Sequence, residues 1–378
     1  MTAQLAVRLD ERRRDMGLGT EFMSAVGLGD DEWADIVSGR RVLTATQFER
    51  ACQVLVVEPA AFYRAEPDDA SLAPARFRGL NDGVVTAPED KRRFAVAAQV
   101  GRELGRLSRV LERTPRIWSH QRAVPVQSRK APWQQGYDLA DRFSRAVSRG
   151  VSPVQDLGGW FRELGVHVVP LVLTTSEVKG VTITGPGCIP VVLVNLGHKG
   201  MSNRGVLRST LAHELAHVLF DVGETGYTTE VSTSNVRRTE RLELVEKRAN
   251  AFGPALLAPT NGLRAYVAQC GLQLSDTGLW RQVAEHWGFS YEGAVSHGKN
   301  VFGLSEDEYI ALVSQQPRPS VRLLGFESTL AGMVSQRTET DHLSDSVFWT
   351  GLAQNLLDHA VEADIVSESV RAELTGAR

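Results

Sequence analysis

The stretch Leu211-Ala212-His213-Glu214-Leu215-Ala216-His217-Val218-Leu219-Phe220 carries the most specific chemical pattern in this chain. Its apolar residues recur at helical spacing, which predicts a buried helix. Residues four apart lie on one face of a helix, so the imidazoles of His213 and His217 can reach one metal ion together. The carboxylate of Glu214 stands beside the first imidazole, where it can hold a metal-bound water and accept its proton. The pattern predicts a catalytic Zn²⁺ site.

A tetrahedral catalytic zinc needs a third protein ligand and one open position. Glu246 opens a second predicted helix, in which Ala249 and Phe252 can pack inward while the carboxylate points at the metal. We therefore expect His213, His217 and Glu246 as ligands and Glu214 as the catalytic base.

Other carboxylates compete for the third position. Glu240 and Glu243 lie on the same predicted helix as Glu246, and spacing alone does not exclude Glu243. Asp221 follows His217 by one helical turn and could also be a ligand. Our preferred interpretation is that Asp221 orients the imidazole of His217 from outside the ligand set.

The composition favours a cytoplasmic protein without a membrane partner. Hydrophobic residues make up 42% of the chain, charged residues 23%, and the net charge is −3, so no global field attracts nucleic acid or anionic lipid. No apolar run is long enough for a membrane span, and the start does not resemble a secretory signal. The three cysteines are far apart and form no CxxC pair, so neither a disulfide framework nor a cysteine zinc site is indicated.

The order of the patterns predicts an α+β fold that is mostly helical. Three β-rich runs (167–174, 178–184 and 188–195) precede the histidine helix and predict a small antiparallel sheet, whose edge could bind an extended peptide. Helical spacing dominates elsewhere. We divide the chain into an all-α domain at 1–65, a helical linker region at 66–133, a peptidase domain at 134–310 and a C-terminal helical region of unknown role at 311–378.

Residues 135–305 resemble the ImmA/IrrE family of bacterial and phage metallopeptidases. The resemblance rests on the strand Val191–Asn195, on the segment from Arg204 to His217 that ends in HELAH, and on the pattern Glu246-x2-Ala249-Asn250-x-Phe252-x3-Leu256-Leu257-x-Pro259. The stretch 283–290 resembles the family's closing helix-turn-helix-like element. One departure is Ala216, where the family usually has glycine.

This resemblance implies a zincin-like core with a thermolysin-like active-site helix, bound zinc, and Glu246 as third ligand. It also implies limited proteolysis of a regulatory protein, typically a helix-turn-helix repressor, in a stress or mobile-element response. The sequence does not assign the group that stabilises the oxyanion: Tyr227, Tyr137 and His286 are candidates on chemistry alone.

Residues 5–64 contain a predicted helix from Glu21 to Val26, the turn Gly27-Leu28-Gly29 and a following helix that ends at Gly39-Arg40-Arg41. In this pattern they resemble an Xre/Cro-type helix-turn-helix domain, as often found fused to ImmA/IrrE peptidases. However, the helix that would enter the major groove begins Asp30-Asp31-Glu32, and phosphates repel carboxylates. Two interpretations stay open: DNA binding through basic residues that include Arg40 and Arg41, or a protein-docking or dimerising module.

The sequence thus predicts a zinc-dependent endopeptidase that hydrolyses a peptide bond in a repressor-like protein, with homodimerisation possible. The alternative is a DNA-binding transcription regulator in which the zinc domain is sensory or structural.

Overall fold

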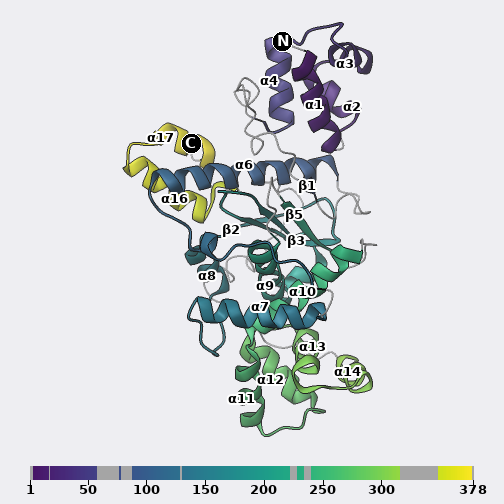
Figure 1. Ribbon diagram of the computed structural model, residues 1–378, viewed down its shortest axis with the longest axis vertical. Coiled ribbons are helices and arrows are strands. Elements are labelled where there is room, and N and C mark those ends of the chain that lie inside the picture. Colours follow the sequence, from purple (N-terminus) through teal and green to yellow (C-terminus); the bar gives the residue numbers. More distant parts are fainter. Residues whose placement is uncertain are drawn as a thin grey trace.

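The computed structural model of the chain describes residues 3–16, 18–57, 76–77, 87–127, 130–221, 228–233, 240–315 and 348–376. Figure 1 shows an N-terminal helical bundle at one end, a layered body around a sheet in the middle, and a second helical group at the other end. Helices outnumber strands, so the α+β class predicted from the sequence is confirmed.

The N-terminal bundle consists of short helices, as predicted: α1 (Ala3–Asp15), α2 (Thr20–Val26), α3 (Asp30–Val37) and α4 (Ala45–Val54). Its core contains an edge-to-face pair of Phe22 and Trp33, whose ring centroids are 5.0 Å apart. The indole Nε1 of Trp33 donates a hydrogen bond of 2.8 Å to Asp10 Oδ1, which joins α3 to α1.

The central sheet has the strand order β1-β5-β3-β4-β2. Its strands are β1 (Arg76–Phe77), β2 (His167–Leu171), β3 (Val178–Thr184), β4 (Val191–Asn195) and β5 (Thr228–Thr233). β3 is antiparallel to both β4 and β5, whereas β2 is parallel to β4 and β1 is parallel to β5. The sheet is therefore mixed, and the prediction of an antiparallel sheet was wrong.

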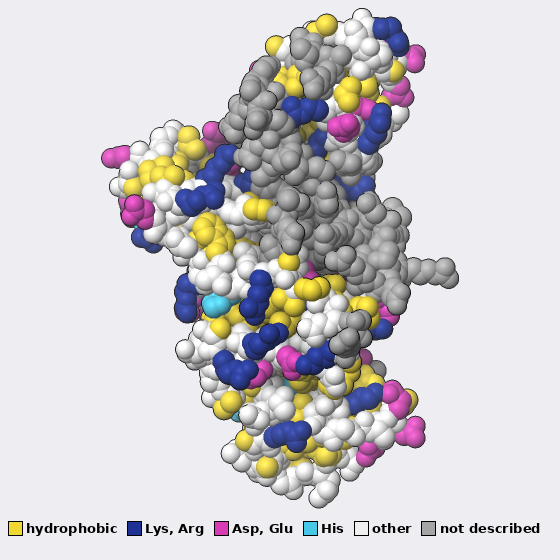
Figure 2. All heavy atoms as spheres, viewed as in Figure 1, with side chains coloured by type: hydrophobic (Ala, Val, Ile, Leu, Met, Phe, Trp, Pro, Cys, Tyr) yellow, Lys and Arg dark blue, Asp and Glu magenta, His cyan; other side chains and the backbone are white. Residues whose placement is uncertain are grey.

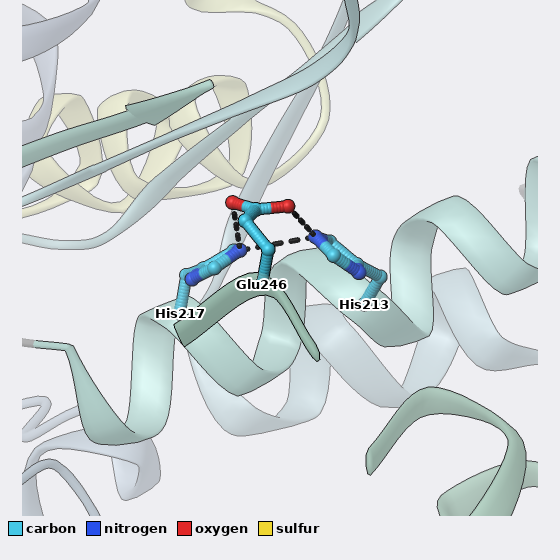
Figure 3. A group of neighbouring side chains, drawn as sticks. All are labelled: His213, His217 and Glu246. Atoms are coloured by element: carbon cyan, nitrogen blue, oxygen red, sulfur yellow. Dashed lines mark hydrogen bonds and ion pairs between the residues drawn. The ribbon is translucent and has the colours of Figure 1, made fainter. Parts of the chain in front are cut away.

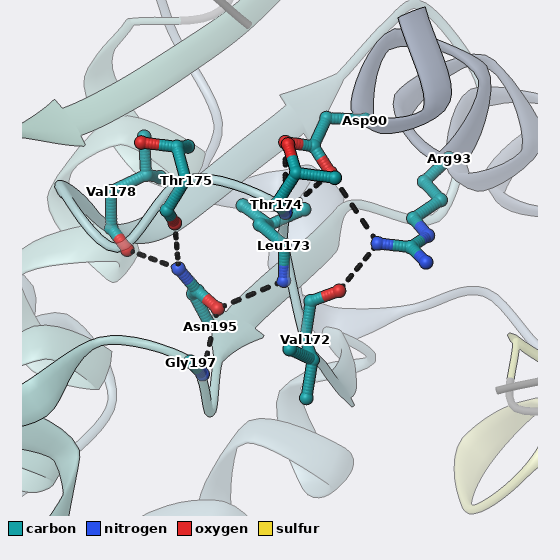
Figure 4. A network of polar contacts seen from close by, with 9 residues as sticks. All are labelled: Asp90, Arg93, Val172, Leu173, Thr174, Thr175, Val178, Asn195 and Gly197. Atoms are coloured by element: carbon teal, nitrogen blue, oxygen red, sulfur yellow. Dashed lines mark hydrogen bonds and ion pairs between the residues drawn. The ribbon is translucent and has the colours of Figure 1, made fainter. Parts of the chain in front are cut away.

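The physical reason is the path between β2 and β3, which crosses the end of β4 instead of forming a hairpin (Figure 4). Asn195, the last residue of β4, holds this connection. Its Oδ1 accepts from the backbone N–H of Leu173 at 3.0 Å, and its Nδ2 donates to the carbonyls of Thr175 at 2.8 Å and Val178 at 2.7 Å. The buried carboxylate of Asp90 accepts from Thr174 N at 3.0 Å and ties the same connection to the helix that follows β1.

Helices cover both faces of the sheet. α6 (Pro88–Val110) lies on one face, and α9 (Arg204–Phe220), which carries HELAH, lies on the other (Figure 1). The side chains of β4 alternate between them: Val191 and Leu193 belong to the core shared with α6, whereas Val192 and Val194 belong to the core shared with α9. α6 lies in the range predicted as a linker region, and it contributes this half of the core.

On its other side α9 packs against α10 (Glu240–Leu257), which in turn packs against α7 (Pro132–Ala146). α7 and α10 approach closely at Gly136, where a Cβ would lie 2.4 Å from the carbonyl oxygen of Arg248. The remaining elements are η2 (Arg116–Ser119), α8 (Leu157–Leu164), η3 (Lys199–Ser202), α11 (Thr260–Cys270), α12 (Thr277–Trp287), α13 (Tyr291–Phe302), α14 (Glu306–Val313), α16 (Leu352–Glu362) and α17 (Glu368–Thr375).

Helix α16, near the end of the chain, packs beside α6 and near the edge strand β2. Buried His167 on β2 donates from Nε2 to the carbonyl of Phe348, 2.9 Å away, just before α16. Within the described part of the chain, no helix combines the length and apolarity that crossing a bilayer requires.

Candidate metal centre

The helix α9 is buried on nearly all sides, which fixes the direction of its polar side chains. Its N-terminus is capped by Asn203, whose side chain accepts from the backbone N–H groups of Gly205 and Val206. At its C-terminus the backbone N–H groups of Arg122 and Val124 donate to the carbonyls of Leu219 and Phe220, each at 2.9 Å. Both ends are therefore held by partners outside the helix, which limits motion of the segment that presents the histidines.

His213, His217 and Glu246 come together in one buried group (Figure 3). The two Nε2 atoms are 3.0 Å apart, Glu246 Oε2 lies 3.4 Å from His213 Nε2, and Glu246 Oε1 lies 3.5 Å from His217 Nε2. The histidines come from successive turns of α9 and the carboxylate from α10. The structure thus places the three residues predicted as metal ligands within reach of a single ion.

The carboxylate of Glu214 lies against the sheet. Its side chain is fully buried, and its Oε2 accepts a hydrogen bond of 2.6 Å from the hydroxyl of Thr182 on β3. The strand nearest this carboxylate is paired on both sides, by β4 and by β5. β3 is therefore an interior strand, and peptide binding along an edge of the sheet stays a prediction.

Asp221 lies directly after α9, with its Oδ2 at 2.9 Å from Nδ1 of His217. Its other oxygen is paired with the guanidinium of Arg248, which also donates to the carbonyl of Val124. Arg248 is 1% exposed, so this ion pair is shielded from solvent. Asp221 therefore contacts the far side of the His217 ring, as expected of an orienting group.

These acidic groups determine the protonation of His217 in the metal-free protein. Burial lowers its pKa, but the hydrogen bond to Asp221 and the charges of Glu246, Asp221 and Glu214 outweigh burial and raise the pKa from 6.5 to about 10. The His217 imidazole is therefore protonated in the metal-free protein, and its positive charge partly compensates the nearby carboxylates, as a bound cation would.

The competing carboxylate Glu243 is exposed, and its Oε1 pairs with Lys247 Nζ on the same helix at 2.6 Å. It is not part of the buried group of donors. The side chain of Glu240, the other competitor, lies outside the described residues.

The three candidates for oxyanion stabilisation differ in where they lie and in what they contact. Tyr227 lies outside the described residues. The hydroxyl of Tyr137 lies 2.5 Å from Nδ1 of buried His297, and burial raises the pKa of Tyr137. His286 stacks on Tyr266 with ring centroids 4.0 Å apart. The partner of Tyr137 is thus on α13 and the partner of His286 is on α11.

In the N-terminal bundle, both candidate DNA-binding residues are paired with acids of α3. Arg40 Nη2 lies 2.6 Å from Asp35 Oδ1, and Arg41 pairs with Glu32. On the face shown in Figure 2, acidic and basic side chains are interspersed over this bundle. These pairs leave less positive charge for phosphate contacts, and DNA binding stays a prediction.

Two residues of the site were not predicted from the sequence. Thr182 lies in the run Val181-Thr182-Ile183-Thr184, whose alternation identifies a strand but not the partner of each hydroxyl. Arg248 lies four residues before the apolar Phe252 and thus on the same face of the predicted helix, and only this spacing could have indicated its burial.

The comparisons with known proteins bear on part of the chain. No curated protein matches it at a significant level. Residues 161–296 match the peptidase M78 family in its IrrE N-terminal-like domain. This range contains His213, Glu214, His217 and Glu246, and it supports the ImmA/IrrE part of the resemblance seen in the sequence. Residues 161–296 are thus similar to the peptidase domain of a family of metallopeptidases.

Proposed function

We propose that this protein is a zinc-dependent endopeptidase in which His213, His217 and Glu246 bind the metal and Glu214 is the general base. The observation that carries the proposal is the triangle formed by the two Nε2 atoms and the carboxylate of Glu246. Donors at ~2.0–2.1 Å from a tetrahedral zinc stand roughly 3.3 Å apart. The two Nε2 atoms are 3.0 Å apart, Glu246 Oε2 lies 3.4 Å from that of His213, and Glu246 Oε1 lies 3.5 Å from that of His217, all close to that spacing.

The charges of the site also fit a divalent cation. Glu214, Glu246 and Asp221 are three carboxylates in and around the donor triangle, and Arg248 is one guanidinium, so the site carries two negative charges when both imidazoles are neutral, as metal ligands must be (−3 + 1 = −2). Uncompensated charge in a protein interior is costly, so these four groups favour a bound dication.

Zinc is the metal that two imidazoles and one carboxylate suit best, and such a set leaves a fourth position open. When bound, it supplies a Lewis acid that activates water for attack on a peptide carbonyl. The carboxylate of Glu214 accepts the proton of that water and returns it to the departing amine. Asp221 fixes the ring of His217 through Nδ1, which directs Nε2 toward the ligand triangle.

The family resemblance supports a regulatory protein as substrate, and we propose a helix-turn-helix repressor in a stress or mobile-element response. The N-terminal bundle is then a docking or dimerising module, or a DNA-binding one. The match to a peptidase family supports the reaction, whereas the identity of the substrate rests on the resemblance alone.

The reaction is tested with zinc-loaded protein and the helix-turn-helix proteins encoded beside its gene as substrates, with cleavage followed by mass spectrometry. Glu214→Gln should keep about one equivalent of zinc and lose cleavage by at least ~100-fold. Glu243→Gln is the matched control, because Glu243 is exposed on α10, and it should cleave as the wild type does. Cleavage at the wild-type rate by Glu214→Gln would overturn the assignment of the base.

A further inference from the structure

Two residues of β3 flank the carboxylate of Glu214. Residues 180 and 182 are two apart on a strand, so they share the face that is turned toward α9. The hydroxyl of Thr182 lies 2.6 Å from Glu214 Oε2 and 3.2 Å from the Glu214 carbonyl oxygen. A Cβ at Gly180 would lie only 2.6 Å from Glu214 Oε1.

From this geometry we infer that Thr182 and Gly180 are positioning residues for the general base. Thr182 holds one carboxylate oxygen by a charge-assisted hydrogen bond, and Gly180 provides the space in which the other oxygen lies. The inference rests on the proposed function, which it deepens by assigning the parts of the sheet that set the direction of Glu214.

A glutamate side chain has three rotatable bonds, and a proton acceptor must lie at a fixed position relative to the attacking water. Thr182 suits this task because it is 1% exposed and β-branched, so its own rotamer is restricted by packing. Its hydroxyl is therefore a fixed point on a rigid strand.

The backbone conformation at position 180 does not require a glycine. β3 has a register irregularity between Val178 and Gly180, but Gly180 is not among the residues with positive φ. An alanine is therefore compatible with the backbone there. The atoms that its Cβ would meet are the end of the Glu214 side chain, so the substitution should displace the carboxylate rather than unfold the strand.

The test uses acetohydroxamate, a small zinc chelator that places a hydroxyl proton where an adjacent carboxylate can accept it. Its dissociation constant is measured on the full cobalt-substituted chain from the visible absorption of Co²⁺. We expect Thr182→Val and Gly180→Ala to weaken acetohydroxamate about tenfold, as the loss of one hydrogen bond to a charged group predicts. Thr182→Ser, which keeps the hydroxyl, should stay within about twofold of the wild type.

Coupling through Glu214 is tested in a Glu214→Ala background, where Thr182→Val should change acetohydroxamate binding by less than about twofold. Cobalt affinity should be unchanged in every Thr182 and Gly180 variant, because neither residue contacts the three ligands in the described structure. Equal weakening by Thr182→Val with and without Glu214, or no weakening at all, would overturn the positioning role. A wild-type chain that takes up no cobalt would instead overturn the proposed function, and the inference with it.

Discussion

Asp221 Oδ2 lies 2.9 Å from His217 Nδ1, and the second oxygen of Asp221 pairs with Arg248. The carboxylate therefore joins an imidazole of α9 to a guanidinium of α10. Because Nδ1 donates to a carboxylate, the neutral His217 has its lone pair on Nε2, the atom that faces Glu246. This one contact selects the tautomer that a metal ligand needs.

Replacement of Asp221 by asparagine should weaken zinc binding about 10- to 100-fold, as is usual when a carboxylate behind a metal-bound histidine is lost. The loss of one buried negative charge acts in the same direction. Competition with a fluorescent chelator measures the dissociation constant. Asp141→Asn is the matched control, since Asp141 forms an exposed pair with Arg145 on α7. Equal zinc affinity in Asp221→Asn and Asp141→Asn would refute the orienting role.

Zinc uptake should release close to one proton near pH 7.5. The pKa of His217 is raised to about 10 in the metal-free protein, so this imidazole is charged at neutral pH and must lose its proton to bind zinc. Zinc affinity should accordingly rise with pH, by about tenfold per unit below that pKa from this group alone. Calorimetry in two buffers of different ionisation enthalpy counts the protons, and a buffer-independent enthalpy would contradict the prediction.

The same raised pKa predicts the pH dependence of the metal-free fold. A pKa above the unfolded value of 6.5 means that the folded state binds the proton more tightly. The stabilisation is fully present below pH 6.5 and is lost as the pH rises toward 10. Urea unfolding of chelator-treated protein should therefore show stability decreasing over this range, and His217→Gln should remove this contribution.

Packing behind the ligands should depend strongly on Phe252. This ring is fully buried on α10, with its centroid 5.4 Å from Phe220 of α9 and 6.5 Å from Phe143 of α7. Phe252→Ala should lower the free energy of unfolding by about 3–5 kcal/mol, because it leaves a cavity between three helices. Ile310→Ala, at a side chain that is 55% exposed, should change it by less than about 0.5 kcal/mol. Chemical denaturation of both variants, saturated with zinc, measures the two free energies of unfolding. Similar losses of stability in Phe252→Ala and Ile310→Ala would contradict this account.

The parts of the fold that follow local rules could be predicted from the sequence. The four-residue spacing of His213 and His217 predicted that both lie on one face of a helix, and the apolar spacing after Glu246 predicted a second helix. The three runs before α9 were recognised as strands from β-rich composition. Their order could not be recognised, because it depends on Asn195 holding a connection that is distant in sequence from the ends it joins.

Residues that act across elements were likewise beyond the sequence pattern. Arg248 contacts Asp221 only because α10 packs along α9, and Thr182 contacts Glu214 only because β3 lies over that helix. A threonine in a strand and an arginine in a helix have no local signature for these partners. The range 66–133 was predicted as a helical linker region, so the place of α6 against the sheet was not predicted.

X-ray absorption at the zinc edge of the purified wild-type chain tests the central claim most directly. A first shell of nitrogen and oxygen at ~2.0–2.1 Å, with the multiple scattering of two imidazoles, is the predicted result. Glu246→Ala should lose one light-atom ligand, while Glu243→Ala should leave the spectrum unchanged. Sulfur at ~2.3 Å, or a chain that binds no zinc after saturation and dialysis, would contradict the account.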